Sequence, residues 1–305
     1  MWGNHYSSLL NSSKDTSSKD FVINTINSSI SNISDFSVSD LMDGVKNLKD
    51  SKASVNLCAE HLKNAHESIF VISSMLFNTM ILHNFLPESM MNTIIVPILK
   101  DKNGDIQDCD NYRPLALTCI FSKLFEFVIL HRYRDLFNTS CNQFGFKQNI
   151  STDMCFLALK ETISYYKCNN TPIFSCFLDA SKAFDKVNHW HLFKKLLDRK
   201  LPCIIVRILI YLYSYQSLSV RWGGCFSTPF RVQNGVPQGR ILSPSFFNLY
   251  MDGLSLRLNC TRLGCSMYDR LINHLFYADD AVILATSPYV LQKLLNICAQ
   301  YADEF

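Results

Sequence analysis

Three aspartates stand where apolar segments of the sequence end. Asp179 follows the apolar run 173–178, and Asp279 and Asp280 lie between two apolar runs within 274–285. An ionised carboxylate beside a buried strand is costly unless something neutralises its charge. Mg²⁺ does this well because it prefers carboxylate and phosphate oxygens. Two such ions about 3.5–4 Å apart can activate an attacking 3′-hydroxyl and stabilise a leaving pyrophosphate.

A simpler interpretation competes with metal binding, because a single aspartate in a turn is more often just a solvated turn residue. The tetrapeptide Tyr277-Ala278-Asp279-Asp280 lies between two apolar, strand-like runs. We therefore predict a β-hairpin with two acids at its tip, and we favour the metal-binding interpretation.

The elements that must hold these acids follow from apolar periodicity and turn residues. Helical spacing predicts helices over 38–48, 58–85, 122–137, 152–166, 243–257 and from residue 288 onward. Ser39 or Asp40 is expected to cap the first of them. β-rich apolar runs predict strands over 93–99, 173–178, 219–222, 230–232, 274–277 and 281–285. Residues 1–35 are rich in Ser and Asn and are predicted to be disordered, because such a segment buries little apolar surface.

The composition permits several functions and favours none. With 305 residues, 48% of them hydrophobic, the chain can bury a large core, and its net charge of +3 allows nucleic-acid binding without arguing for it. The twelve cysteines, without a leader peptide, indicate reduced and mostly buried thiols in an intracellular protein. Cys260, Cys265 and His274 fit no zinc template. The apolar runs 68–86 and 203–213 read as core helices, so no membrane partner is predicted.

Five segments together resemble the motifs of reverse transcriptases, in the form found in LINE-type (non-LTR) retrotransposons. The three palm motifs A, B and C are matched by Phe177-Leu178-Asp179-Ala180-Ser181-Lys182-Ala183-Phe184-Asp185-Lys186-Val187, by Asn234-Gly235-Val236-Pro237-Gln238-Gly239-Arg240-Ile241-Leu242-Ser243-Pro244, and by Phe276-Tyr277-Ala278-Asp279-Asp280. The finger motifs are matched by Ile95-Val96-Pro97-Ile98-Leu99-Lys100 and Asn111-Tyr112-Arg113-Pro114-Leu115, and Gln143-Phe144-Gly145-Phe146-Lys147 follows them as in the family. The order and spacing match as well, over about 36–305.

The resemblance implies an α+β chain with the right-hand polymerase fold, whose palm is an antiparallel sheet. It implies an N-terminal extension and fingers over 36–170, and a palm over 171–305 with a fingers insertion at about 200–232. The family pattern continues into a motif D and a thumb beyond the point where this sequence stops, and an endonuclease region belongs to the parent protein. We therefore expect a truncated fragment that extends primers poorly by itself.

The implied activity is RNA-directed DNA polymerisation, with an RNA template, a DNA primer and dNTPs as partners. Asp179 and Asp279 would bind two Mg²⁺ ions, or Mn²⁺, with Asp280 close by and the Ala180 carbonyl completing a metal site. This reaction would take place in the nucleus, although the sequence shows no targeting signal.

The resemblance also implies a nucleotide site. Phe184 would lie under the incoming sugar and exclude a 2′-hydroxyl, although it is equally suited to a core position. Arg113 and Lys100 would hold the triphosphate, for which a guanidinium is well shaped. Gln238 and Gly239 would line the nucleotide and template pocket.

Two departures from the family pattern keep other interpretations open. Segment 52–57 lacks the usual glycine-containing turn, and Arg240 replaces a small residue beside the expected substrate pocket, where it could meet phosphate or block the template. The main alternative is an inactive retrotransposon relic that keeps the fold and binds nucleic acid. A third candidate, another palm-fold enzyme such as a nucleotide cyclase, is disfavoured by motif B and by Arg113.

Overall fold

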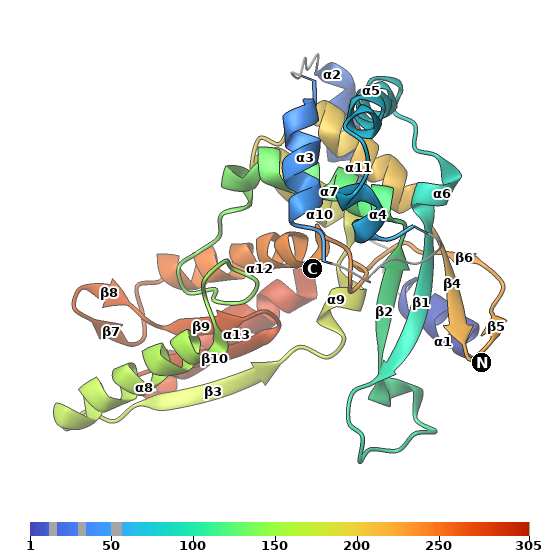
Figure 1. Ribbon diagram of the computed structural model, residues 1–305. Helices are drawn as coiled ribbons and strands as arrows, with labels where there is room; N and C mark the ends of the chain where they lie inside the picture. The colour runs from blue at the N-terminus through green and yellow to red at the C-terminus, as the bar shows by residue number, and fades with distance from the viewer. Residues whose placement is uncertain (12–16, 30–34, 50–56, 305) are drawn as a thin grey trace. The chain divides into compact units, whose positions relative to one another are not determined.

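The computed structural model describes residues 1–11, 17–29, 35–49 and 57–304, and segment 52–57 lies mostly outside them (Figure 1). The chain forms two compact units, Met1–Phe137 with Asp185–Ser243, and Asn138–Phe184 with Pro244–Phe305. These units do not follow the bounds that the resemblance implied for fingers and palm, so their assignment to fingers and palm stays a prediction.

The first unit is built on a mixed sheet. Its strands are β1 (Asn92–Leu99), β2 (Tyr112–Thr118), β4 (Ser217–Trp222), β5 (Cys225–Phe226) and β6 (Phe230–Arg231). The order is β2-β1-β4-β5, with β6 also paired to β4; β1 runs antiparallel to β2 and parallel to β4. Side chains alternate across the sheet, so one row of them, which includes Ile95, Ala116 and Leu218, faces a common core.

Helices complete this unit. They are α1 (Trp2–Leu9), α2 (Ser17–Ser28), α3 (Val38–Lys46), α4 (Ala59–Lys63), α5 (Ser68–His83), α6 (Glu88–Met91), α7 (Ile120–Arg132), α10 (His189–Asp198) and α11 (Cys203–Tyr215), with 3₁₀ turns η1 (Cys109–Asn111) and η2 (Arg134–Phe137). The short α9 (Ala183–Lys186) lies where the chain passes from the second unit to the first. None of the helices in the described residues is both long and apolar enough to span a bilayer.

The prediction that 1–35 is disordered was wrong for the residues described there, which include α1 and α2. The segment is polar on average, but its few apolar residues fall at helical spacing and are buried. Tyr6 and Leu10 join the core beside the mixed sheet, and Val22 and Ile26 are also buried. The residues of each pair are four positions apart, so each helix has one apolar stripe along its side. Such a stripe is enough to hold a helix in place when a sheet or another helix packs against it.

Two predicted details of the next helices were also wrong. The cap of α3 is Ser37, whose hydroxyl accepts from the Asp40 amide, while the Asp40 carboxylate accepts from the Ser37 amide. This reciprocal capping box satisfies two amides that a helix start leaves unpaired, which neither Ser39 nor Asp40 alone would do. The predicted helix 58–85 is interrupted between α4 and α5, where the His66 ring accepts the Ser68 amide.

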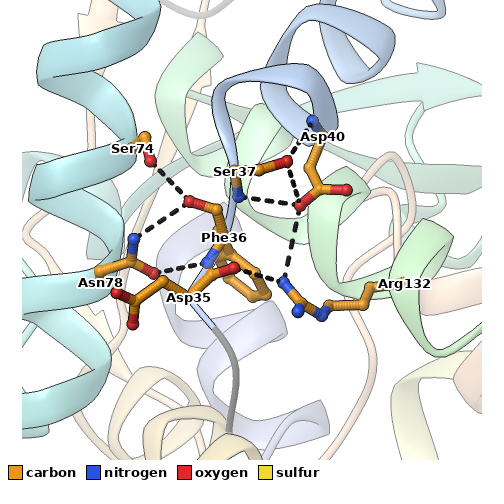
Figure 2. Close-up of polar contacts among 7 residues, drawn as sticks. All are labelled: Asp35, Phe36, Ser37, Asp40, Ser74, Asn78 and Arg132. Carbon is orange, nitrogen blue, oxygen red and sulfur yellow. Dashed lines mark hydrogen bonds and ion pairs between the residues drawn. The ribbon is translucent and has the colours of Figure 1, made fainter.

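Phe36 ties α3 to its neighbours (Figure 2). Its amide donates to the Asn78 side chain over 2.8 Å, and its carbonyl accepts from Asn78 and from the Ser74 hydroxyl. Its ring is buried beneath the Arg132 guanidinium of α7, which also donates to the Asp35 carbonyl. Backbone groups outside regular structure are thereby satisfied by side chains of α5 and α7.

The second unit contains the predicted carboxylate sheet. Its strands are β3 (Phe174–Asp179), β9 (His274–Tyr277) and β10 (Asp280–Ala285), in the antiparallel order β3-β10-β9. Its helices are α8 (Thr152–Cys168), α12 (Ser243–Cys260) and α13 (Pro288–Glu304), and a small hairpin is formed by β7 (Ser266–Met267) and β8 (Arg270–Leu271). Figure 1 shows β3, β10 and β9 side by side. The α+β class and the antiparallel sheet are confirmed.

Both faces of the central strand β10 are covered. Ile283 and Ala285 of β10 pack with residues of α12 and α13. Val282 and Leu284 point to the other face and pack with residues of α8. The period-2 alternation of β10 therefore separates two cores, and this explains why the strand reads as a continuous apolar run.

All twelve cysteines are free thiols. Only Cys265 is buried, so the prediction of mostly buried thiols was wrong. The His274 ring, which the sequence groups with Cys260 and Cys265, instead contacts the Ser255 hydroxyl at 2.6 Å and the Asn273 carboxamide at 2.7 Å.

Candidate active site

The β9–β10 hairpin carries the two adjacent aspartates at its tip. Tyr277 pairs with Asp280, so Ala278 and Asp279 form a two-residue turn. Ala278 has a φ of 59°, whereas Asp279 has no positive φ. That pattern matches a type II′ turn, whose twist suits a tight antiparallel hairpin. An alanine in this backbone conformation is unusual, because the Cβ is crowded there.

Asp280 lies directly opposite Asp179 in the β10–β3 register. Opposed residues of an antiparallel pair point to the same face, so both carboxylates leave the sheet on the α8 side. Both side chains are exposed, and Asp279 is half-buried. The register therefore places Asp179 and Asp280 at one end of the sheet, with Asp279 next to Asp280 in the chain. That Asp179 and Asp279 share a metal site stays a prediction.

A pocket of about 350 Å³ opens beside the two opposed acids. It is lined by Asp179 and Asp280 together with apolar side chains of α8, among them Cys155, Phe156 and Leu159. Two like charges directly opposite each other repel, and a cation bound between them would relieve this repulsion. The arrangement therefore suits a cationic ligand.

The donor set fits a hard divalent cation. The acids supply only oxygen ligands, which Mg²⁺ and Mn²⁺ accept. Within the part of the chain that the structure describes, no three His, Cys, Asp or Glu side chains gather closely enough to enclose a metal ion. Mg²⁺ does not require such a cage, because it usually keeps several waters and shares its remaining positions between one or two carboxylates and substrate phosphates.

The first unit brings a second group of predicted residues together around β2. The Ala116 amide donates to the Gln238 carbonyl over 2.6 Å, and Leu115 forms a bridge with Gln238. Gly239 follows with a φ of 114°, and a Cβ there would lie 2.6 Å from the Ala116 carbonyl oxygen. Only glycine fits this close approach without strain. Motif B is thus fastened to the strand that carries Arg113.

Residues 98–305 match the family described as reverse transcriptase (RNA-dependent DNA polymerase). The chain belongs to this reverse transcriptase family. It is 26% identical over 261 residues to a probable RNA-directed DNA polymerase from transposon BS of Drosophila melanogaster, a match that covers 82% of this chain and 28% of that protein. It is 27% identical over 246 residues to the Pol polyprotein of the type-2 retrotransposable element R2DM of the same species, covering 77% of this chain and 22% of that protein.

A third curated relative and a solved structure are also similar to this chain. The RNA-directed DNA polymerase from mobile element jockey of Drosophila funebris is 26% identical over 236 residues, covering 76% of this chain and 25% of that protein. A telomerase structure from Candida albicans, with a TWJ fragment of telomeric RNA, aligns with a TM-score of 0.47 and 11% identity over 72% of this chain and 41% of its own. This reverse transcriptase chain spans about a quarter of the length of the curated relatives it matches. The resemblance to LINE-type retrotransposon polymerases is confirmed.

The remaining predicted nucleotide-site residues of this reverse transcriptase chain differ in their surroundings. Arg113 is exposed on β2, on the same side of the strand as Leu115. Lys100 is also exposed, and its ammonium donates to the Asp110 carbonyl over 2.8 Å. An ammonium carries three donors, so this bond leaves Lys100 able to contact a further anion.

Phe184 lies in the second unit and is held by two other rings. It stacks on Phe247 of α12 with centroids 4.2 Å apart and an interplanar angle of 13°. Phe146 meets it edge to face at 5.8 Å. The half-buried Phe184 ring is therefore fixed in orientation, which serves both a core role and a surface against which a sugar could pack.

Arg240 is buried and paired, so the expectation that it could meet phosphate or block the template was wrong. The residue is 3% exposed, and its Nε lies 3.4 Å from Oε1 of Glu126 on α7. The other carboxylate oxygen of Glu126 accepts the Ile241 and Leu242 amides. The cation therefore points into the protein, where an otherwise unfavourable buried charge has an opposite charge beside it.

The predicted residues thus fall into two groups. Asp179, Ala180, Phe184, Asp279 and Asp280 belong to the second unit, and Lys100, Arg113, Gln238 and Gly239 belong to the first. That the residues of each group act together at one site stays a prediction.

Sequence reasoning missed one residue of this site, Gln143. It is 2% exposed, and its carboxamide bonds to the backbone of the hairpin turn. The available signal was a polar residue inside the short apolar run Gln143-Phe144-Gly145-Phe146, because a buried carboxamide must find partners.

Proposed function

We propose that this chain is the polymerase region of a non-LTR retrotransposon protein and adds deoxynucleotides to the 3′-hydroxyl of a DNA primer, directed by an RNA template. The observation that carries the proposal is the direct opposition of Asp179 and Asp280 on one face of the sheet, with Asp279 at the adjoining turn. Family membership over 98–305 supports the same activity. The printed names of the relatives, as RNA-directed DNA polymerases, agree with it.

The three acids would hold two Mg²⁺ ions, for which Mn²⁺ could substitute. Asp179 and Asp279 would each bind both ions, Asp280 would support them, and the Ala180 carbonyl would complete one site. When bound, divalent cations lower the cost of generating the attacking oxygen and of releasing pyrophosphate. The carboxylates themselves orient the ions through side chains that start from a rigid antiparallel sheet.

The other residues would position the nucleotide. Arg113 and Lys100 would contact the triphosphate oxygens, and the planar guanidinium suits two of them at once. Phe184, held by Phe247, would leave no room for a 2′-hydroxyl. Gln238 and Gly239 would contact the nucleotide and template at the point where motif B meets β2.

Single-nucleotide addition tests the proposal more directly than processive synthesis, because one addition does not require the enzyme to stay on the primer. The chain is mixed in excess with an RNA template, a labelled DNA primer and one dNTP, in Mg²⁺ or Mn²⁺. We expect template-directed addition that falls on the order of 10²-fold or more in Asp279→Asn, as for loss of other groups that stabilise transition-state charge.

Asp269→Asn is the matched control, because it removes the same charge in the turn of the β7–β8 hairpin, where the positive φ of 63° suits asparagine. Addition that is equal in wild type and Asp279→Asn would refute the assigned chemistry. A wild-type chain that binds primer–template but adds no nucleotide in either metal would favour the inactive relic.

A further inference from the structure

We propose that Gln143 is a positioning residue that sets the direction of the Asp279 carboxylate by fixing the turn before it. The inference rests on the proposed function, because it gives Asp279 the task of binding a cation. The argument concerns only residues of the second unit.

The segment around Gln143 extends the carboxylate sheet. The Phe276 amide donates to the Asn142 carbonyl and the Phe144 amide donates to the Phe276 carbonyl, both over 2.8 Å. Gln143 and Phe276 form a parallel bridge. The chain at 142–144 thus runs beside β9, on the side away from β10, and reaches the level of the turn.

The Gln143 carboxamide then closes on the turn itself. Its Oε1 accepts the Ala278 amide over 3.1 Å and the Gly145 amide over 2.8 Å. Its Nε2 donates to the Ala278 carbonyl, at a longer 3.4 Å. One buried side chain therefore contacts both backbone polar groups of the residue that precedes Asp279 in the chain. Removing it would leave these groups unsatisfied in a buried place, which costs more than the bonds themselves contribute.

Gly145 allows this approach. A Cβ at this position would lie 2.3 Å from the Ala278 nitrogen, so only glycine lets the two backbones meet. The Gly145 carbonyl accepts from the Asn248 side chain of α12 over 2.7 Å. The segment is therefore bonded to α12 on one side and to the turn on the other.

The turn needs such support. Its first residue, Ala278, has a positive φ, a conformation that is unfavourable for an L-residue other than glycine because its Cβ is crowded there. If the Ala278 peptide rotated, the next residue, Asp279, would be displaced with it. Loss of a partner that orients a metal ligand typically weakens metal affinity by roughly 10–100-fold. The Gln143 carboxamide bonds to both the amide and the carbonyl of Ala278, and it therefore affects metal binding by fixing the backbone before Asp279.

The test compares Gln143→Met, which keeps the length of the side chain and removes its polar atoms, with Gln292→Met. Gln292 is exposed on α13, and its carboxamide donates to the Asn296 side chain in the same helix, so the same chemical change is made away from the turn. Mn²⁺ binding is measured by electron paramagnetic resonance on the whole chain, without nucleotide. The Mg²⁺ dependence of single-nucleotide addition is measured in parallel.

We expect Gln143→Met to raise the half-saturating metal concentration roughly 10-fold or more in both measurements, with the affinity for primer–template unchanged. Gln292→Met should match wild type. Gln143→Glu keeps the acceptor for the two amides and loses the donor, so its shift should be smaller; it decides the question if Gln143→Met does not fold. Folding is checked by thermal unfolding.

A folded Gln143 variant with a lower melting temperature but wild-type metal dependence would overturn the inference and leave Gln143 a purely structural residue. Failure of the proposed function looks different: Asp279→Asn would then bind Mn²⁺ and add nucleotides as wild type does. The two failures are therefore distinguished in one set of measurements.

Discussion

Asp179 and Asp280 are cross-strand partners in the antiparallel pair of β3 and β10, so two like-charged side chains project from directly opposed positions on the same face. Like charges in such positions destabilise a sheet. If the two acids bind metal, their opposition should also affect the stability of the folded chain. This effect can be measured without an activity assay.

We predict that Asp280→Asn stabilises the metal-free chain and weakens its response to metal. Removing one charge should increase the free energy of unfolding by up to about 1 kcal/mol, the usual scale of cross-strand pairs. The rise in melting temperature on adding Mg²⁺ or Mn²⁺ should shrink, because a ligand stabilises only to the extent that it binds the folded state. Thermal unfolding with and without metal measures both. If Asp269→Asn has the same two effects, the opposition of Asp280 and Asp179 is not their cause.

We predict that Arg240→Met is strongly destabilising, by about 3–5 kcal/mol, because it leaves the Glu126 carboxylate buried without its cation. Combining it with Glu126→Gln should recover much of the loss, since the paired charges disappear together. Denaturant unfolding measures both variants. Arg257→Met provides the comparison: Arg257 and Glu304 form an exposed bidentate pair, and its loss should cost at most about 1 kcal/mol. Equal losses for Arg240→Met and Arg257→Met would contradict the argument.

We predict that His274 makes the second unit sensitive to acid. Burial lowers the pKa of this histidine from 6.5 to about 4. Between these values the unfolded chain binds a proton that the folded chain does not, so stability falls as the pH is lowered from 6.5 towards 4. A shift of this size corresponds to about 3 kcal/mol when fully developed. His274→Gln should flatten this part of the stability–pH curve, while His83→Gln, on the exposed surface of α5, should not. An unchanged slope in His274→Gln would show that other groups govern acid unfolding.

We predict that Phe184→Val admits ribonucleotides. If the ring excludes a 2′-hydroxyl, shortening it should raise the ratio of ribonucleotide to deoxyribonucleotide kcat/KM roughly 10-fold or more, a scale typical of steric discrimination. Single-nucleotide addition with each substrate gives the ratio. Phe226→Val, an exposed phenylalanine on β5, should leave it unchanged. An unaltered ratio in Phe184→Val would leave Phe184 only its packing against Phe247.

The strands of the carboxylate sheet could be predicted from the sequence because each is recognised from its own neighbouring residues. The strand 173–178 and the hairpin strands around 277–280 read directly as apolar runs, and an alternating pattern fixes which side chains share a face. The two-residue turn fixes the register of β9 against β10, whereas the register that opposes Asp179 to Asp280 joins segments far apart in the sequence and was not predictable in this way. The positive φ of Ala278 was not predictable, because alanine gives no signal for that conformation.

The partners of buried polar residues could not be predicted in the same way. Glu126 and Arg240 are 114 positions apart, and nothing near either one shows that their charges meet. Gln143 contacts Ala278 across 135 positions. The prediction for the N-terminal helices was wrong for another reason. The average composition of 1–35 is polar and gives no sign of the two short apolar stripes that pack against the sheet and helices of the first unit. Propensity and composition describe isolated segments, whereas these features depend on tertiary contacts.

The buried pair of Arg240 and Glu126 also constrains how this element's descendants can diverge. A lineage that loses either residue first must pass through a protein with a lone buried charge, which folds poorly. The two codons should therefore change together. In copies that are no longer under selection, the two positions can change independently of each other. The joint state at positions 126 and 240 in neighbouring copies can thus separate those that were selected to fold from those that merely decayed.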